Sequence, residues 1–192
     1  MSKGLIGVLA IVGIIAVFIF SFFMWGTGVY DNSVKLQEEV NESWGNVQAA
    51  YQRRADLIPS LVATVKGAAE NEKGILVQVT QARAGIVGAK TPEDLERAGK
   101  QINTAINLAF EAYPQIRSTE RFADLQSQLE GTENRINVSR QRYNETIKGY
   151  NGYIRGYFKS SALSWFGKGE DWTPKKPFAA AEGSDKAPEV KF

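Results

Sequence analysis

The 192-residue sequence contains no cysteine and no histidine. Without cysteine the chain has no disulfide, no thiol nucleophile and no thiolate metal ligand. Without histidine it lacks the commonest general base and the commonest transition-metal ligand, including the Glu-x-x-His pairs of helical di-iron sites. We therefore expect no catalytic site, no cofactor and no metal centre, although chemistry based on carboxylates alone stays open.

The chain also lacks an excess of charge of either sign. It has 23 lysines and arginines against 21 acidic residues, and Lys3 accounts for part of the net charge of +2. Nucleic-acid-binding surfaces need clustered positive charge. We therefore expect no nucleic acid among the partners.

One long apolar run stands at the N-terminus, and residues 4–30 carry no charge. The stretch from Leu5 to Trp25 would span about 31 Å as a helix, close to the ~30 Å of a bilayer's hydrocarbon core. Trp25 and Tyr30 suit the membrane–water interface. A cleaved signal peptide is the alternative, but its apolar region would be shorter and would end in small residues. The run predicts an uncleaved transmembrane anchor.

The charges that flank the anchor bear on its orientation. Lys3 lies before it, and Lys35 is the only basic residue within ten positions after Trp25. The positive-inside rule then favours a cytoplasmic N-terminus and a body on the external side of the membrane, with the cytoplasmic side as the alternative.

A heptad pattern follows the anchor. Apolar or aromatic residues recur at alternating steps of four and three from Val40 to Ile86. The pattern predicts one helix from near Asn32 to near Val87, kinked at Pro59 because proline removes a backbone hydrogen bond.

Two further helices are expected. Thr91 is a helix-capping residue type and Pro92 suits the first helical position, so a second helix should run from Pro92 to about Ala112 and end before Pro114. A third should run from Ser118 to Gly156 and lie back along the first. The fold class is therefore all-α: an N-terminal transmembrane helix followed by an antiparallel long-helix bundle.

The expected domains are an anchor over residues 1–30, a helical bundle over 31–166 and a flexible Pro/Lys-rich tail over 167–192. Tyr157-Phe158 and Trp165-Phe166 form an apolar patch before the tail. This patch either inserts at the membrane surface or caps the end of the bundle.

Polar residues interrupt the apolar seams at Arg54, Glu72, Thr132, Arg140 and Asn144. We expect buried arginines and carboxylates to pair across the bundle and fix its register. The alternative is an enzyme that uses Asp56, Glu111 and Glu133 as acid–base groups.

A pair of residues recurs in the third predicted helix. Tyr143-Asn144 is followed seven positions later by Tyr150-Asn151, so one helix face repeats after two turns. The repeat is either an interaction stripe or ordinary bundle packing.

Three segments in this order give the chain a specific resemblance: WGNVQAAYQRRADLIPSL from Trp44, EAYP from Glu111, and LQSQLEGTENRINVSRQRYNETIKGYNGY from Leu125. Together with the anchor they resemble the LemA family of bacterial membrane proteins over roughly residues 1–165. The resemblance implies a single membrane helix with an α-helical bundle, and no established catalytic residues. The matching positions are family-motif residues with a structural role: Arg54, Asp56, Pro59, Glu111, Tyr113, Pro114, Glu133, Asn134, Arg140 and Asn144.

These observations favour a membrane-anchored scaffolding protein of the bacterial cytoplasmic membrane, which self-associates through its bundle in the membrane plane. Its partners would be membrane lipid, other copies of itself and, as a further option, another membrane protein. The alternative function is a monomeric adaptor that holds a peptide or helix of another membrane protein. The membrane-interface residues are Trp25, Tyr30, Trp165 and Phe166.

Overall fold

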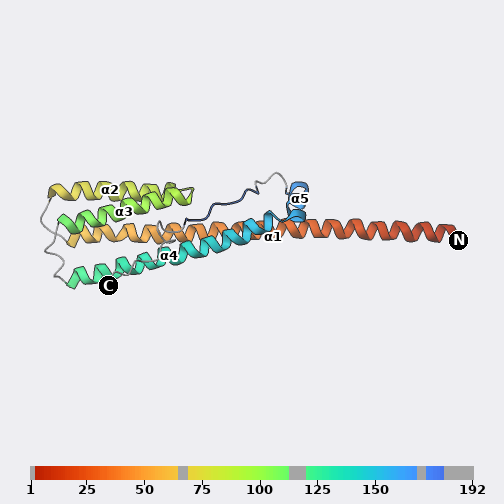
Figure 1. Cartoon of the computed structure of the whole chain (residues 1–192), viewed down its shortest axis with the longest axis horizontal. Coiled ribbons are helices and arrows are strands. Elements are labelled where there is room, and N and C mark those ends of the chain that lie inside the picture. Colours follow the sequence, from red (N-terminus) through yellow and green to blue (C-terminus); the bar gives the residue numbers. More distant parts are fainter. Residues whose placement is uncertain (1–2, 65–68, 113–119, 168–171, 180–192) are drawn as a thin grey trace, which may run out of the picture. The chain divides into compact units, whose positions relative to one another are not determined.

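The computed structural model describes residues 3–64, 69–112, 120–167 and 172–179. Within these ranges every regular element is a helix, which confirms the all-α class (Figure 1). The helices are α1 Lys3–Thr64, α2 Ala69–Gly88, α3 Pro92–Ala112, α4 Glu120–Ile154 and α5 Tyr157–Phe166.

The chain forms two compact units. Unit 1 comprises residues 1–41 and 146–175, and unit 2 comprises residues 42–145 and 176–192. Helices α1 and α4 each contribute one part to each unit. We describe each unit by itself.

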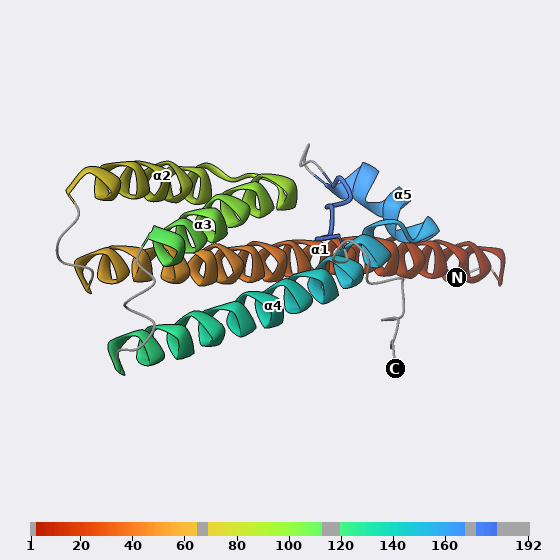
Figure 2. The same cartoon turned by 60° about the vertical axis from the view of Figure 1, so that its left-hand side comes forward.

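Unit 2 is an antiparallel four-helix bundle made of α2, α3 and parts of α1 and α4 (Figure 2). All four helices direct apolar side chains into one core, because an amphipathic helix must bury its apolar stripe against partners. The core residues include Val47, Ala55, Ala82, Ile86, Leu95, Ile102, Leu129 and Ile136.

The prediction of one helix over residues 32–87 was wrong. Helix α1 begins at Lys3, passes Pro59 and ends at Thr64, and α2 is a separate helix that lies antiparallel to it. The Gln48 side-chain amide of α1 donates hydrogen bonds to the carbonyls of Ile86 and Ala89, at 3.3 and 3.2 Å. The apolar pattern stayed in phase because both helices face the same core, not because they are one helix.

Helix α3 has the bounds that the sequence predicts, Pro92–Ala112. The backbone N–H of Asp94 donates to the Thr91 hydroxyl at 3.2 Å, and this hydroxyl donates to the Asp94 carboxylate at 2.9 Å. Thr91 thereby satisfies a helix N–H that has no partner inside the helix.

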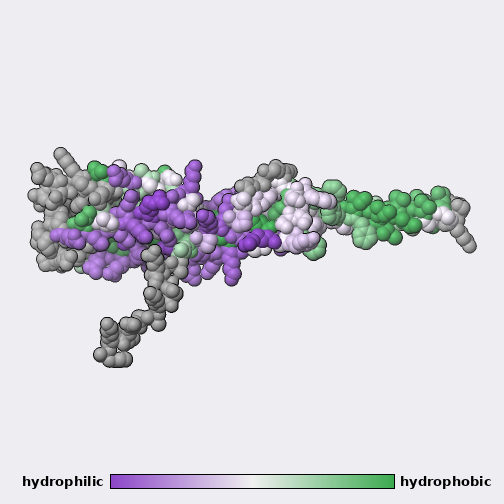
Figure 3. Space-filling view, turned by 45° about the horizontal axis from the view of Figure 1, so that its top comes forward, coloured by the Kyte–Doolittle hydropathy of each residue, from purple (hydrophilic) through white to green (hydrophobic). Residues whose placement is uncertain are grey.

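Unit 1 contains the apolar N-terminal part of α1. In the described residues, α1 is the one helix long and apolar enough to cross a membrane: its best 18-residue window has a mean hydropathy of 3.0 and is entirely unburied. Figure 3 shows this hydrophobic surface along the N-terminal part of α1. A helix that is apolar all round and unburied fits a single-pass membrane anchor.

Candidate functional site

Trp165 and Phe166, at the end of α5, pack against the anchor inside unit 1. The Phe166 ring lies 5.9 Å from Phe22 and 5.7 Å from Phe23, measured between ring centroids, and Trp165 lies 6.0 Å from Phe22. Aromatic pairs at such distances each contribute about 0.5–1.5 kcal/mol beyond the burial of area. The contacts hold α5 on the surface of α1.

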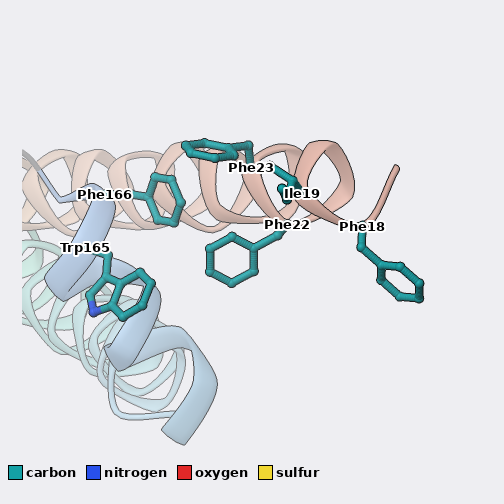
Figure 4. A pocket seen from close by; sticks show the side chains of 6 residues that line it. All are labelled: Phe18, Ile19, Phe22, Phe23, Trp165 and Phe166. Carbon is teal, nitrogen blue, oxygen red and sulfur yellow. The ribbon is translucent and has the colours of Figure 1, made fainter. Parts of the chain in front are cut away.

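These side chains line an open apolar groove of about 630 Å³ (Figure 4). We call it the aromatic groove, and its lining residues are Phe18, Ile19, Phe22, Phe23, Trp165 and Phe166. None of these six residues is polar enough to bind a charged ligand. The groove therefore suits acyl chains or apolar side chains.

Two glycines determine where α5 begins and how closely it approaches α1. Gly156 adopts an extended backbone (φ −61°, ψ 132°) between α4 and α5, and its carbonyl accepts the first hydrogen bond of α5, from Ser160 at 2.7 Å. Gly26 provides the space for the ring of Phe166, since a Cβ at this position would overlap that ring. Glycine at residue 26 thus lets α5 approach the anchor closely.

The outer surface of α5 carries three large aromatic side chains. Tyr157, Phe158 and Trp165 are 72–80% exposed, whereas Ala162 and Leu163 are buried. Residues of this kind are typical of helices that lie in the membrane interface. Phe166 packs on the anchor part of α1, and most of the Trp165 surface is exposed. Insertion of this patch at the membrane surface and capping of the bundle both stay predictions.

The serine hydroxyls of α5 are satisfied by hydrogen bonds within the helix. The hydroxyls of Ser160 and Ser161 donate to the Tyr157 carbonyl, and that of Ser164 donates to the Ser161 carbonyl. The ammonium of Lys159, the one charged residue of α5, lies 3.9 Å from the centroid of the Tyr153 ring. Internal hydrogen bonds of this kind lower the cost of moving a helix into lipid.

The two other predicted interface residues also lie in unit 1. Trp25 is partly exposed and lies 6.0 Å from Phe22. Tyr30 packs edge-to-face on Trp172 at 5.9 Å. Aromatic contacts thus continue along α1 on both sides of Gly26.

The polar seam residues of unit 2 form ion pairs between helices. Arg54 pairs with Glu133, linking α1 to α4. Arg140 pairs with Glu96 at 2.6 Å, linking α4 to α3. Pairing across the bundle is the arrangement that the sequence favoured, and it ties the register of the helices.

The three carboxylates proposed as acid–base groups do not meet. Asp56 pairs with Arg83 at 2.8 Å, Glu133 pairs with Arg54, and Glu111 is exposed near the end of α3. Asp56 and Glu133 are therefore each paired with an arginine of another helix. The arrangement gives Asp56 and Glu133 a structural role, which is to link two helices each.

A tyrosine packs beside these ion pairs. Tyr51 of α1 is buried, and a Cβ at Gly99 of α3 would overlap its ring. Burial raises the pKa of the Tyr51 hydroxyl, and the charge of Arg140 opposes this rise. Burial likewise lowers the pKa of the Arg54 guanidinium. Tyr51 and Gly99 bring α1 and α3 into close contact.

The remaining family-motif positions and polar seam residues carry less information. Asn134 is exposed, and Thr132 is buried with its hydroxyl donating to the Leu129 carbonyl at 2.8 Å. Tyr113 and Pro114 lie outside the described residues, as do the side chains of Pro59 and Glu72.

Sequence reasoning missed one part of the predicted tail. Residues 172–179 are placed, and Phe178 is 3% exposed in unit 2 against Trp44 and Tyr143. Its backbone N–H and carbonyl both bond to the side chain of Asn144. The Tyr143-Asn144 repeat was the available signal. Residues 168–171 and 180–192 lie outside the described part.

Comparison with known proteins agrees with the resemblance seen in the sequence. The model of the LemA family matches residues 43–192. The Protein LemA of Metamycoplasma hominis is 23% identical to this chain over 127 residues, which make up 64% of this chain and 58% of that protein. The chain thus spans under two thirds of the length of this relative.

Proposed function

Since the chain belongs to the LemA family, we propose that it is a membrane-anchored scaffolding protein that self-associates, through its bundle and beside its anchor, in the plane of the membrane. The aromatic groove carries this proposal. An open apolar groove of about 630 Å³ on a membrane-spanning helix is filled either by lipid chains or by a neighbouring helix. Side-by-side copies would cover it and the outer face of α5.

The surface of the bundle supports the same proposal. Several large aliphatic side chains stand exposed on three helices of unit 2: Val77, Val87, Leu108 and Val138. Single exposed apolar residues are normal on any protein. Copies that pack side by side would nevertheless bury these four side chains without any rearrangement of the bundle. Of the three carboxylates considered as acid–base groups, Asp56 and Glu133 form ion pairs and Glu111 is exposed, which favours a structural role over an enzymatic one.

The proposal includes a location. We place the protein in the bacterial cytoplasmic membrane with its body on the external side, on the basis of Lys3 before the anchor. Reporter fusions after Phe192 test this side: a reporter that is active only outside the cytoplasm supports it. A reporter that is active only in the cytoplasm reverses the orientation and leaves the scaffold proposal standing.

The test of self-association is the mass of the full-length protein in mild detergent, measured by light scattering. We expect a uniform assembly of many copies, and a monomer at all concentrations would contradict the proposal. Phe22→Ala with Trp165→Ala should weaken the assembly, because both residues line the groove. Phe20→Ala is the matched control, since Phe20 is an exposed anchor phenylalanine that does not line the groove.

A further inference from the structure

The C-terminal segment is bound in unit 2 by a built site. The Phe178 ring stacks on Trp44 with 6.0 Å between centroids and a 21° angle between planes, and meets Tyr143 edge-on at 5.4 Å. The Arg140 guanidinium carbon lies 4.8 Å from the centroid of the same ring. Two aromatic rings and a cation therefore surround one phenylalanine, which makes it the anchor of the segment.

The backbone of the segment is also bound. The Asn144 amide donates to the Phe178 carbonyl at 3.1 Å, and its oxygen accepts from the Phe178 N–H at 2.8 Å. Arg140 donates to the Ala179 carbonyl at 3.1 Å. A side-chain amide that pairs with both the N–H and the carbonyl of one residue mimics the neighbouring strand in a sheet. This pattern recognises extended peptide backbone.

Unit 1 contains a second pair of bonds of the same kind. Asn151 donates to the Lys175 carbonyl at 2.8 Å and accepts from the Lys175 N–H at 2.9 Å. Asn144 and Asn151 are the two asparagines of the Tyr-Asn repeat in α4. The repeat therefore has a defined use, which is to bond the backbone of the C-terminal segment.

Charge complements these contacts. The Lys176 ammonium lies 3.8 Å from the Glu93 carboxylate, and Glu96 holds the Arg140 side chain that contacts Phe178. The Lys176–Glu93 pair is exposed, so it contributes little to affinity. It favours a basic segment over an acidic one.

We propose that Trp44, Arg140, Tyr143 and Asn144 form a binding site for an extended, basic segment with a phenylalanine anchor, and that in the assembly this segment comes from a second copy. The inference rests on the proposed self-association. Every copy carries one site and one matching segment, so an exchange between neighbours conserves each contact. Such exchange is a low-cost route to association, because no new surface has to be built.

The first experiment uses two full-length variants in mild detergent. Phe178→Ala removes the anchor of the segment, and Asn144→Leu removes the backbone bonds of the site. Each variant alone should co-purify with a differently tagged copy of itself about tenfold less than wild type does. A mixture of the two should regain association, because one copy supplies an intact site and the other an intact segment. Lys176→Ala is the control and should associate as wild type does.

The second experiment uses the wild-type protein, so it does not depend on the folding of any variant. A synthetic peptide with the sequence of residues 172–179 should dissociate tagged copies from each other. The same peptide with alanine in place of Phe178 should not.

The outcomes separate the two proposals. If wild type associates while both variants associate equally well and the peptide has no effect, segment exchange is wrong and self-association stands. If the mixture of variants regains nothing, the segment binds only within its own copy, which also contradicts the exchange. If wild type is monomeric, both proposals fail.

Discussion

The two parts of α1 carry their apolar side chains in different ways. Between Leu5 and Trp25 the apolar residues lie all round the helix and are exposed. From Val40 to Ala55 they form one stripe that is buried against other helices, and polar residues fill much of the rest. The backbone is helical in both parts, so the distribution of apolar side chains determines what surrounds each part. A helix that is apolar on all sides requires lipid, and a helix with one apolar stripe requires partner helices.

The largest effect is expected when one arginine is introduced into the anchor, compared with one introduced on the surface of the bundle. Val17→Arg in the anchor should prevent stable insertion, because an arginine at the centre of a membrane helix costs about 2.5–3.5 kcal/mol even on insertion scales. Val87→Arg on α2 should leave the retention of the protein in the membrane unchanged. Both valines are exposed, at 65% and 78%. Carbonate extraction of membranes measures the difference, and equal retention of the two variants would refute the anchor.

The second test removes a leucine from each environment. Leu95 is fully buried in unit 2, so Leu95→Ala should lower the free energy of unfolding by about 2–5 kcal/mol. Leu9 is exposed in the anchor, and Leu9→Ala should leave the stability of the bundle unchanged. Chemical denaturation of the full-length protein in detergent gives both values. An equal loss in the two variants would contradict the separate burial of the two parts.

The third test concerns the close approach of α5 to the anchor. Gly26→Ala places a Cβ against the ring of Phe166 and should cost about 1–3 kcal/mol through overpacking. In this variant we expect the backbone amides of α5 to exchange their hydrogens faster than in the wild-type protein. Gly7→Ala is the matched control, because no atom lies within 4 Å of a Cβ there. Unchanged exchange in Gly26→Ala would mean that α5 does not pack at this place.

The smallest expected effect lies at the start of α3. Thr91→Ala removes the cap and should cost about 1 kcal/mol of bundle stability. The hydroxyl of Thr91 lowers the pKa of the Asp94 carboxyl. This depressed pKa adds stability above the usual pKa of aspartate, and the added stability is lost as the pH falls through the lowered value. In Thr91→Ala the pKa of Asp94 should return toward its usual value, as measured by NMR titration.

Local signals in the sequence were sufficient for several elements. The bounds of α3 were predicted because Thr91-Pro92 and the acidic first turn act within a few residues. The anchor was predicted because length and lack of charge suffice for it. Arg54 and Arg140 were expected to pair across helices, and their partners Glu133 and Glu96 do so.

Other features depended on contacts between distant residues. The pattern from Val40 to Ile86 could not distinguish one long helix from two helices that share a core, because both give the same spacing. Phe178 lies in a Pro/Lys-rich stretch that composition describes as a tail. The position of Phe178 depends on contacts with Trp44, Tyr143 and Asn144, which lie far away in the sequence.

Energy transfer between labelled copies in lipid vesicles tests self-association most directly. Two fluorophores are attached to separate pools of the full-length protein, and the amount of lipid per protein is then increased. The scaffold account predicts transfer that persists on dilution and falls in the variant with Phe22→Ala and Trp165→Ala. Transfer that decreases in proportion to dilution, as for independent molecules, would contradict it.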